Sequence, residues 1–294
     1  MKRISTLCIA LCTIMTCFAQ SDTTGKQNPV PQNDTIRIGG MIIIRKAGNP
    51  RDPVDKDSTV AYNKKYKMKN RRGDKPSNLS TNWWIFDFGF SNYSDKTIYS
   101  SATAQAYAPG SNSTWFDLDD SKSRSINVWF FMQRLNVVKH VLNLKYGLGL
   151  ELNNYNYKQP IRYNANPPAI VNPPRVSFDG TVGRTYEKNK LAADYLTVPM
   201  MVNFNFTPSR KKGFGLSAGI SVGYLYNARN KTVTSDEGKL KAKDDFELEK
   251  WKLSYVAELT LGPVRLYGSY AFKSMYERGL DITPYNFGFR FSNW

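Results

Sequence analysis

The chain has 294 residues, enough for one large domain or two ordinary ones, and a formal net charge of +17. That charge suggests nucleic acid, but the sequence has no helix-turn-helix, zinc-finger or RNA-binding motif, so we expect no nucleic-acid partner. All three cysteines lie within the first 19 residues, which leaves the rest of the chain without disulfides or cysteine metal ligands. Basic surface facing lipid phosphates or polyanionic glycans is the use of the charge that we expect.

Residues 1–19 have the pattern of a secretory signal peptide. Lys2 and Arg3 precede an apolar run, and the small residue Ala19 marks a plausible cleavage site before Gln20. No later stretch reaches the roughly 18 continuous apolar residues that a membrane-spanning helix needs. Residues 20–82 are polar and rich in Pro, Asn, Asp and Lys, so we expect a mostly disordered periplasmic segment with room for one hairpin, in DTIRIGGMIIIRKAG.

From residue 83 onward, eight stretches alternate apolar and polar residues. They cover residues 83–92, 124–135, 141–157, 195–206, 214–226, 251–261, 264–276 and 285–294. A period of two predicts β-strands with one apolar face and one polar face. The second stretch is less regular, because Trp129 and Phe131 fall on the polar side while Phe130 and Met132 fall on the apolar side. Gly147 and Gly149 fall on the polar phase and are interpreted as spacers inside a barrel.

The connections between these stretches alternate in length. Short turns at one end, long loops at the other and an even strand number are typical of an outer-membrane barrel. The sequence therefore predicts an all-β fold: an eight-stranded antiparallel up-and-down transmembrane β-barrel over residues 83–294, in the outer membrane of a Gram-negative cell. We expect the long loops to be extracellular. The aromatic Trp294 suits the end of such a barrel, although a β-bulge near Ser292–Asn293 is needed to turn its side chain to the lipid.

A soluble lipocalin-like barrel is the alternative, and in it the apolar faces would line a ligand cavity. The polar faces of the stretches consist of Gly, Ser, Asn and charged residues. Glycine weakens an exposed strand and packs nothing, so these faces suit a barrel interior better than a soluble surface. We therefore expect the apolar faces to contact lipid.

Charged residues on the polar phase form the candidate site. They are Asp87, Lys145, Glu151, Lys252, Glu258, Arg265, Lys273 and Arg290. Unpaired charge away from water is costly, so we expect these residues to form a network of ion pairs across the lumen. The chain's one histidine, His140, falls in a predicted periplasmic turn, and no residues form a catalytic, cofactor or defined metal motif; the acidic DLDD at 117–120 lacks the spacing of a calcium loop.

Several stretches resemble the PorT-like small outer-membrane β-barrels of the Bacteroidota. The stretches are residues 144–157, 188–206, 215–231 and 274–291, together with DTIRIGG, and YLTVP with Pro199 inside a strand is the most specific of them. The resemblance implies an outer-membrane location and an eight-stranded barrel, without an established activity for most members. The tripeptides DTT, DTI and DST also resemble an O-glycosylation pattern of that phylum, which makes Thr23, Thr35 and Ser58 candidate glycosylation sites.

The leading functional hypothesis is a non-enzymatic barrel, a structural or interaction module of the cell envelope whose lumen is plugged by side chains. A narrow pore or secretion-system accessory barrel is the alternative, followed by a lipocalin-like binding barrel and a membrane-embedded enzyme. The partners that we expect are outer-membrane lipid and lipopolysaccharide, the barrel-assembly machinery during insertion and other envelope proteins.

Overall fold

The computed structural model describes residues 35–38, 41–44, 77–167, 169–208 and 213–292. In the first two ranges, β1 (Thr35–Ile38) and β2 (Met41–Ile44) form the antiparallel hairpin for which the sequence had room, and Thr35 is its first residue. The signal peptide, most of the segment predicted as disordered, Thr23, Ser58 and the bulge before Trp294 lie outside the described residues.

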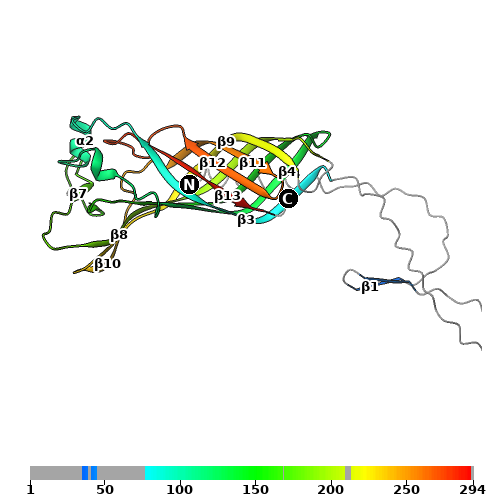
Figure 1. The fold of residues 1–294 in the computed structure, drawn as a ribbon, viewed down its shortest axis with the longest axis horizontal. Coiled ribbons are helices and arrows are strands. Elements are labelled where there is room, and N and C mark those ends of the chain that lie inside the picture. The colour runs from blue at the N-terminus through cyan, green and yellow to red at the C-terminus, as the bar shows by residue number, and fades with distance from the viewer. Residues whose placement is uncertain (1–34, 39–40, 45–76, 168, 209–212, 293–294) are drawn as a thin grey trace, which may run out of the picture. The chain divides into compact units, whose positions relative to one another are not determined.

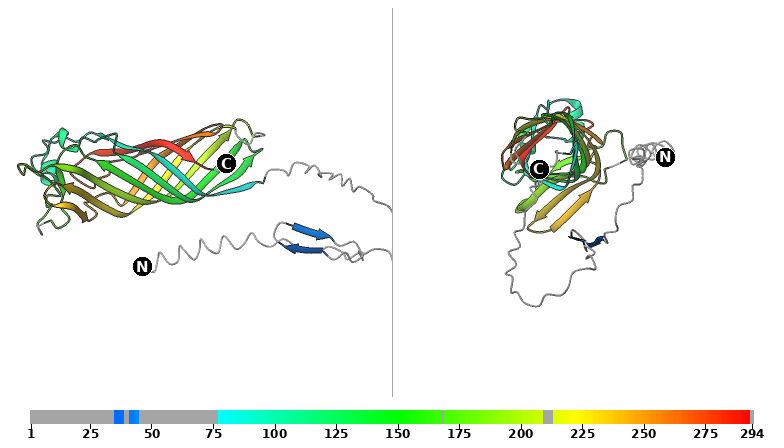
Figure 2. Two further views of the ribbon diagram at one scale, coloured as in Figure 1. Left: turned by 60° about the horizontal axis from the view of Figure 1, so that its bottom comes forward. Right: turned by 90° about the vertical axis from the view of Figure 1, so that its right-hand side faces the viewer.

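Eight antiparallel strands close into a ring (Figures 1 and 2). In ring order they are β3 (Leu79–Asp95), β4 (Arg124–Val138), β5 (Leu142–Asn156), β8 (Tyr186–Asn205), β9 (Phe214–Thr234), β11 (Trp251–Leu261), β12 (Val264–Ala271) and β13 (Ile282–Phe291). β13 pairs with β3 and so joins the last strand to the first. Each of the eight predicted stretches overlaps one of these strands, so the expected all-β antiparallel ring is confirmed.

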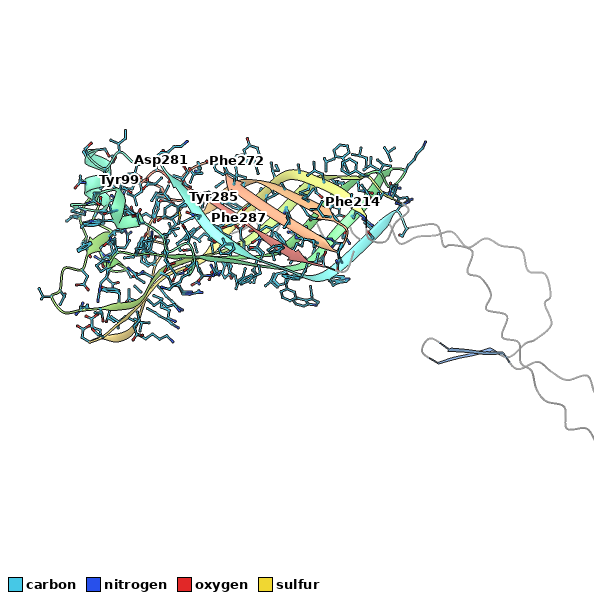
Figure 3. The ribbon with its side chains drawn as sticks, viewed as in Figure 1. Tyr99, Phe214, Phe272, Asp281, Tyr285 and Phe287 are labelled. Atoms are coloured by element: carbon cyan, nitrogen blue, oxygen red, sulfur yellow. The ribbon has the colours of Figure 1, made fainter. Side chains whose placement is uncertain are left out.

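The two ends of the ring differ, and we call them the turn end and the loop end. At the turn end, residues 139–141 join β4 to β5, and the first two, Lys139 and His140, have positive φ angles of 45° and 59°, as the central residues of a primed turn require. Gly262, with φ of 64°, makes the tight turn from β11 to β12 at the same end. The loop end carries the longer connections, and Figure 3 shows Tyr99 and Asp281 there and Phe214 at the turn end.

The faces of the strands have opposite chemistry. Many apolar side chains face outward, and those between 40% and 61% exposed include Phe86, Phe88, Leu196, Val198, Ile220, Tyr255, Phe287 and Phe289. Inward-facing polar side chains are buried, and those at most 4% exposed include Ser125, Asn127, Asn153, Thr197, Ser221 and Ser254. An apolar, lipocalin-like cavity needs the reverse arrangement, so this alternative is wrong.

A local irregularity in β3 and β4 corrects one face assignment. Trp84, which has a positive φ of 56°, and Phe130 lie opposite each other but do not pair in the β3–β4 ladder. Phe130 is also one extra residue of β4 in the pairing with β5, which makes a β-bulge. Their rings meet edge to face with centroids 5.9 Å apart. The alternation shifts by one residue beyond this point, so Met132, predicted to face outward, is buried at 1% exposure.

Two glycines make room for the inward side chains of β4. A Cβ at Gly149 would lie 2.7 Å from Cε3 of Trp129, and a Cβ at Gly147 would lie 2.9 Å from Cγ of Met132. Both distances are closer than packed carbon atoms allow. The glycines of β5 therefore act as interior spacers next to Trp129 and Met132, two large side chains of β4 that point into the ring.

Packed connections cover the loop end, and we call them the loop cap. Its elements are α2 (Ala102–Tyr107), the 3₁₀ helix η1 (Ser113–Phe116), β6 (Ile161–Tyr163), β7 (Val176–Phe178) and β10 (Gly238–Lys243), which pairs antiparallel with the loop-end half of β9. The cap shares one hydrophobic core with the loop ends of the ring strands; its fully buried members include Tyr107, Phe116, Tyr155, Ile161, Leu191 and Phe246. The sequence predicted these segments only as long connections. No helix among the described residues is long and apolar enough to cross a membrane.

Candidate functional site

A chain of four charged residues crosses the inside of the ring. Arg290 of β13 and Asp87 of β3 are cross-strand partners, with Nε–Oδ1 and Nη2–Oδ2 distances of 2.7 Å each. Nη1 of Arg290 lies 2.5 Å from Oε2 of Glu258 on β11. Nζ of Lys145 on β5 lies 2.7 Å from both oxygens of Glu258. The chain Asp87–Arg290–Glu258–Lys145 therefore links four strands of the ring.

Neutral donors and aromatic rings complete the surroundings of this chain. The indole Nε1 of Trp129 donates to Asp87 at 2.7 Å, and Nδ2 of Asn127 donates to the same oxygen at 3.2 Å. The guanidinium of Arg290 lies 5.5 Å from the ring centroid of Trp129. A buried carboxylate with several donors and a bidentate arginine has the geometry that offsets the cost of burying charge.

A second pair lies nearer the loop end. Nζ of Lys252 on β11 donates to Oε1 of Glu151 on β5, and the side chains of both residues are 7% exposed. Nδ2 of Asn286 donates to the same carboxylate oxygen at 3.0 Å. Lys252 also lies over the ring of Tyr195, 5.0 Å from its centroid. Seven of the eight predicted charges, Arg265 included, are at most 9% exposed.

Lys273 is the exception and corrects the prediction. β12 ends at Ala271, two residues before it, so the alternation that assigned Lys273 to the lumen no longer holds. Its side chain is 58% exposed and its Nζ lies 2.6 Å from Oε1 of Glu249 in the loop before β11. It belongs to the surface of the loop end rather than to the lumen.

Arg134 is a lumen-side charge that the prediction missed. It follows the shift in β4 at Phe130, so counting the alternation from Trp129 places it on the wrong face. With Lys145, Glu258 and Arg265 it lines a cavity of about 60 Å³ at the turn end. The irregular alternation at Trp129 and Phe131 was the available signal for this shift.

The middle of the ring has little free space. A cavity of about 20 Å³ lies there, lined by Asn127, Trp129, Glu151, Tyr267 and Arg290 among others. That volume is close to the space that one water molecule occupies. At this level the interior is therefore filled by the charged network and the aromatic side chains around it.

Tyrosine hydroxyl groups link the core of the loop cap. The hydroxyl oxygens of Tyr157 and Tyr163 are 2.7 Å apart, and those of Tyr163 and Tyr276 are 2.6 Å apart. The hydroxyl of Tyr107 donates to the carbonyl oxygen of Phe246 at 2.7 Å. Burial raises the pKa of Tyr163 well above its usual value, and the neighbouring Tyr157 adds to the shift, so the hydroxyl stays protonated.

A cavity of about 630 Å³ lies at the loop end beside η1. Its charged and aromatic lining includes Asp95, Lys96, Tyr99, Asp117, Asp120 and Lys158. Nδ2 of Asn92 donates to Asp120 at 2.9 Å, and Lys122 pairs with Asp119 at 2.8 Å. Within the described part of the chain, no group of three or more His, Cys, Asp or Glu residues could hold a metal ion.

No curated protein matches the chain significantly. Residues 86–280 match the family described as outer membrane protein beta-barrel domain, and this region covers more than half of the chain. It extends from β3 into the segment between β12 and β13 and contains all of the seven buried charges except Arg290. The chain therefore belongs to the outer membrane protein β-barrel domain family, and its eight-stranded ring is a barrel of the outer membrane.

Proposed function

We propose that this protein is a non-enzymatic structural or interaction module of the outer membrane, with a lumen closed by its own side chains. The observation that carries the proposal is the chain Asp87–Arg290–Glu258–Lys145, which joins strands from different sides of the barrel. An eight-stranded barrel has an interior just wide enough for side chains to fill. The second pair, Glu151–Lys252, and the small mid-lumen cavity support the same conclusion.

The proposal also gives the barrel an orientation. We place the turn end, with both ends of the barrel segment, on the periplasmic side and the loop cap outside the cell. The supporting feature is the difference in loop length, with short turns at one end and long connections at the other. In bacterial outer-membrane barrels the short turns are periplasmic and the long loops are extracellular. In this orientation the segment before β3, including the candidate glycosylation site Thr35, is periplasmic.

The packed loop cap and its cavity of about 630 Å³ support a role in interaction. That volume lies in the range of ligand-binding pockets. Envelope proteins or glycans outside the cell are the partners that we propose for it, and lipid and the assembly machinery are partners of the barrel wall. The narrower assignment to the PorT-like barrels of the Bacteroidota is part of this proposal, supported by the stretches around Pro199 and residues 274–291.

Planar-bilayer recording from the purified full-length chain tests the closed lumen. We expect no steady single-channel current, because the central charges are paired and the space between them is about the size of one water molecule. A stable ohmic current would overturn the plug and favour the narrow pore. Glu258→Gln, which removes the carboxylate between Lys145 and Arg290, is recorded under the same conditions. A current from this variant alone shows that the assay detects a lumen whose network is broken.

Labelling of intact cells tests the orientation. The three native cysteines lie within the first 19 residues, so Ser235→Cys adds one thiol at the loop end of the mature chain. A membrane-impermeant maleimide should label Ser235→Cys on intact cells. A cysteine at His140, in the turn between β4 and β5, should be labelled only after the outer membrane is opened. The reverse result would invert the barrel.

A further inference from the structure

A three-stranded sheet beyond the barrel wall carries a strongly basic face. The sheet consists of β10 and the loop-end halves of β8 and β9, and it projects past the ring (Figure 1). We call its outward side the basic face, which consists of Lys188, Lys190, Arg229, Lys231, Lys239, Lys241 and Lys243. The residues alternating with them, such as Asn189, Asn230 and Thr232, are buried against the loop cap.

The pairing register places these cations in rows across the strands. Lys190, Lys231 and Lys241 are direct partners in one row, and Arg229 and Lys243 are partners in the next. Neighbouring strands lie about 4.8 Å apart, and every second residue along a strand is about 7 Å away. The basic face is therefore a grid of cationic side chains that start from closely spaced backbone positions on one side of the sheet.

Most of this charge has no carboxylate partner among the residues that the structure describes. Arg229 pairs with Asp194 at 2.7 Å, and Lys190 donates to Asn154. Among the residues that the structure describes, no carboxylate forms an ion pair with Lys188, Lys231, Lys239, Lys241 or Lys243. Glu187, at the register shift beside Lys188, is exposed and forms no ion pair within the described part of the chain.

Keeping like charges in direct opposition across strands costs stability. Burial lowers the pKa of Lys231, and the charges of Lys188 and Lys239 lower it further. The same mutual repulsion lowers the pKa of Lys190, after the effect of its burial. A sheet that retains this arrangement is best explained by an external anion that offsets the repulsion.

The position of the basic face identifies the source of that anion. Leu196 of β8 and Tyr226 of β9 are 40% and 47% exposed on the outer wall, and they end its apolar band. The cations follow on the same outward side of the same two strands, toward the loop end. They therefore point sideways, at the level where the headgroups of lipids packed against the barrel begin.

We propose that the basic face binds the phosphate groups of lipopolysaccharide molecules that surround the barrel in the outer leaflet. This assignment rests on the proposed orientation, in which the loop end is extracellular. A phosphorylated glycolipid carries several anionic groups close together above the acyl chains, which matches a grid that starts at the edge of the apolar band. The contact would fix the height of the barrel in the membrane and hold the extension of β8, β9 and β10 against the headgroups.

The test uses the purified full-length barrel in a neutral detergent and a purified lipopolysaccharide that contains only the phosphorylated lipid A and inner-core sugars. The triple variant Lys190→Gln, Lys231→Gln, Lys241→Gln removes the middle row of the basic face. The control triple variant Lys122→Gln, Lys250→Gln, Lys273→Gln removes the same charge from exposed positions of the loop end that lie outside the basic face and outside the lining of the 630 Å³ cavity. Heat-modifiable gel mobility shows that each variant is folded before binding is measured.

We expect the middle-row variant to bind roughly 100-fold more weakly than the wild type, since each surface lysine near anionic lipid contributes about fivefold. The control variant should bind like the wild type, and removing the phosphate groups from the glycolipid should abolish the difference. Equal weakening in both variants, or undiminished binding of the dephosphorylated glycolipid, would overturn the proposal.

A soluble polyanion is the competing occupant. Heparin that displaced the glycolipid from the wild type at equal affinity would show a general polyanion surface and would overturn the assignment to the membrane. Binding to the purified protein does not depend on the orientation of the barrel in the membrane. The binding experiment therefore tests the basic face, and cell labelling at Ser235 tests the orientation independently. A folded barrel without phosphate-dependent binding contradicts this inference and leaves the proposed function intact.

Discussion

The guanidinium of Arg290 and the carboxylate of Asp87 form a bidentate ion pair across the seam at which the barrel closes. The two residues are direct partners on β13 and β3, the last and first strands of the ring, and both contacts measure 2.7 Å. Two strands that lie about 200 residues apart in the sequence are thus joined by charge as well as by backbone hydrogen bonds. The pair stabilises the closure of the ring rather than a local hairpin.

Asp87→Asn should therefore weaken the whole barrel. The substitution leaves the arginine with Glu258 as its remaining carboxylate partner, and breaking one partner of a buried pair typically costs about 3–5 kcal/mol. The free energy of unfolding in denaturant, followed by tryptophan fluorescence in lipid or detergent, measures the loss. Phe88→Leu, an outward-facing change on the neighbouring position, serves as the control and should cost much less. Equal midpoints for Asp87→Asn and the wild type would show that the seam pair contributes nothing.

Glu258 should be the most sensitive position of the network, because it accepts from both Lys145 and Arg290. Glu258→Gln leaves two buried cations close together, whereas Lys145→Met removes one cation and leaves the other pair intact. We expect the double variant to be less destabilised than the sum of the single variants, with a coupling of roughly 0.5–3 kcal/mol. Denaturant midpoints of the four proteins give this coupling, and strict additivity would contradict a shared network.

The strands and the charged network followed from alternation, and the errors occurred where alternation breaks. Met132 was assigned to the wrong face and Arg134 was missed because Phe130 is one extra residue in β4. The pairing register between β4 and β5, which reveals this extra residue, cannot be seen in a single sequence. Lys273 was misassigned because β12 ends at Ala271, and strand ends depend on tertiary pairing.

The loop cap could not be predicted from local sequence patterns. Its elements are short, with six residues in α2 and three each in β6 and β7. Such pieces have little stability of their own and form because they bury side chains against distant strands. The contact between the hydroxyl groups of Tyr163 and Tyr276 joins residues 113 positions apart, a relationship that no periodic pattern encodes.

Leu148→Arg should impair membrane assembly. Leu148 lies on the outward face of β5, opposite Phe131 of β4, and a charge there is transferred into hydrocarbon. At the middle of the membrane this costs roughly 2–4 kcal/mol in a transmembrane barrel. Leu148→Met keeps an apolar side chain of similar volume and should assemble normally. The fraction of heat-modifiable protein in isolated outer membranes measures both variants, and normal assembly of Leu148→Arg would show that this face does not contact lipid.

The loop cap should loosen at acidic pH through Asp179, which follows β7. Its carboxylate accepts from Arg184 at 2.7 Å and from the hydroxyl groups of Tyr186 and Thr181 at 2.5 and 2.6 Å. Burial alone would raise the pKa of Asp179, but these hydrogen bonds outweigh it and hold the pKa well below the usual range.

A depressed carboxyl pKa in the folded state stabilises that state above the unfolded pKa of about 3.9, and this stabilisation is lost as the pH falls toward the folded value. Hydrogen exchange of residues 176–186, corrected for intrinsic rates, should therefore be slow at pH 7 and clearly faster at about pH 3. Asp179→Asn should exchange rapidly at both pH values, because the amide cannot replace the charge that faces Arg184. Asp281→Asn, at an exposed position of the loop end, should keep the wild-type pH dependence. Unchanged protection of the wild type at about pH 3 would remove Asp179 as the acid-sensitive group of the cap.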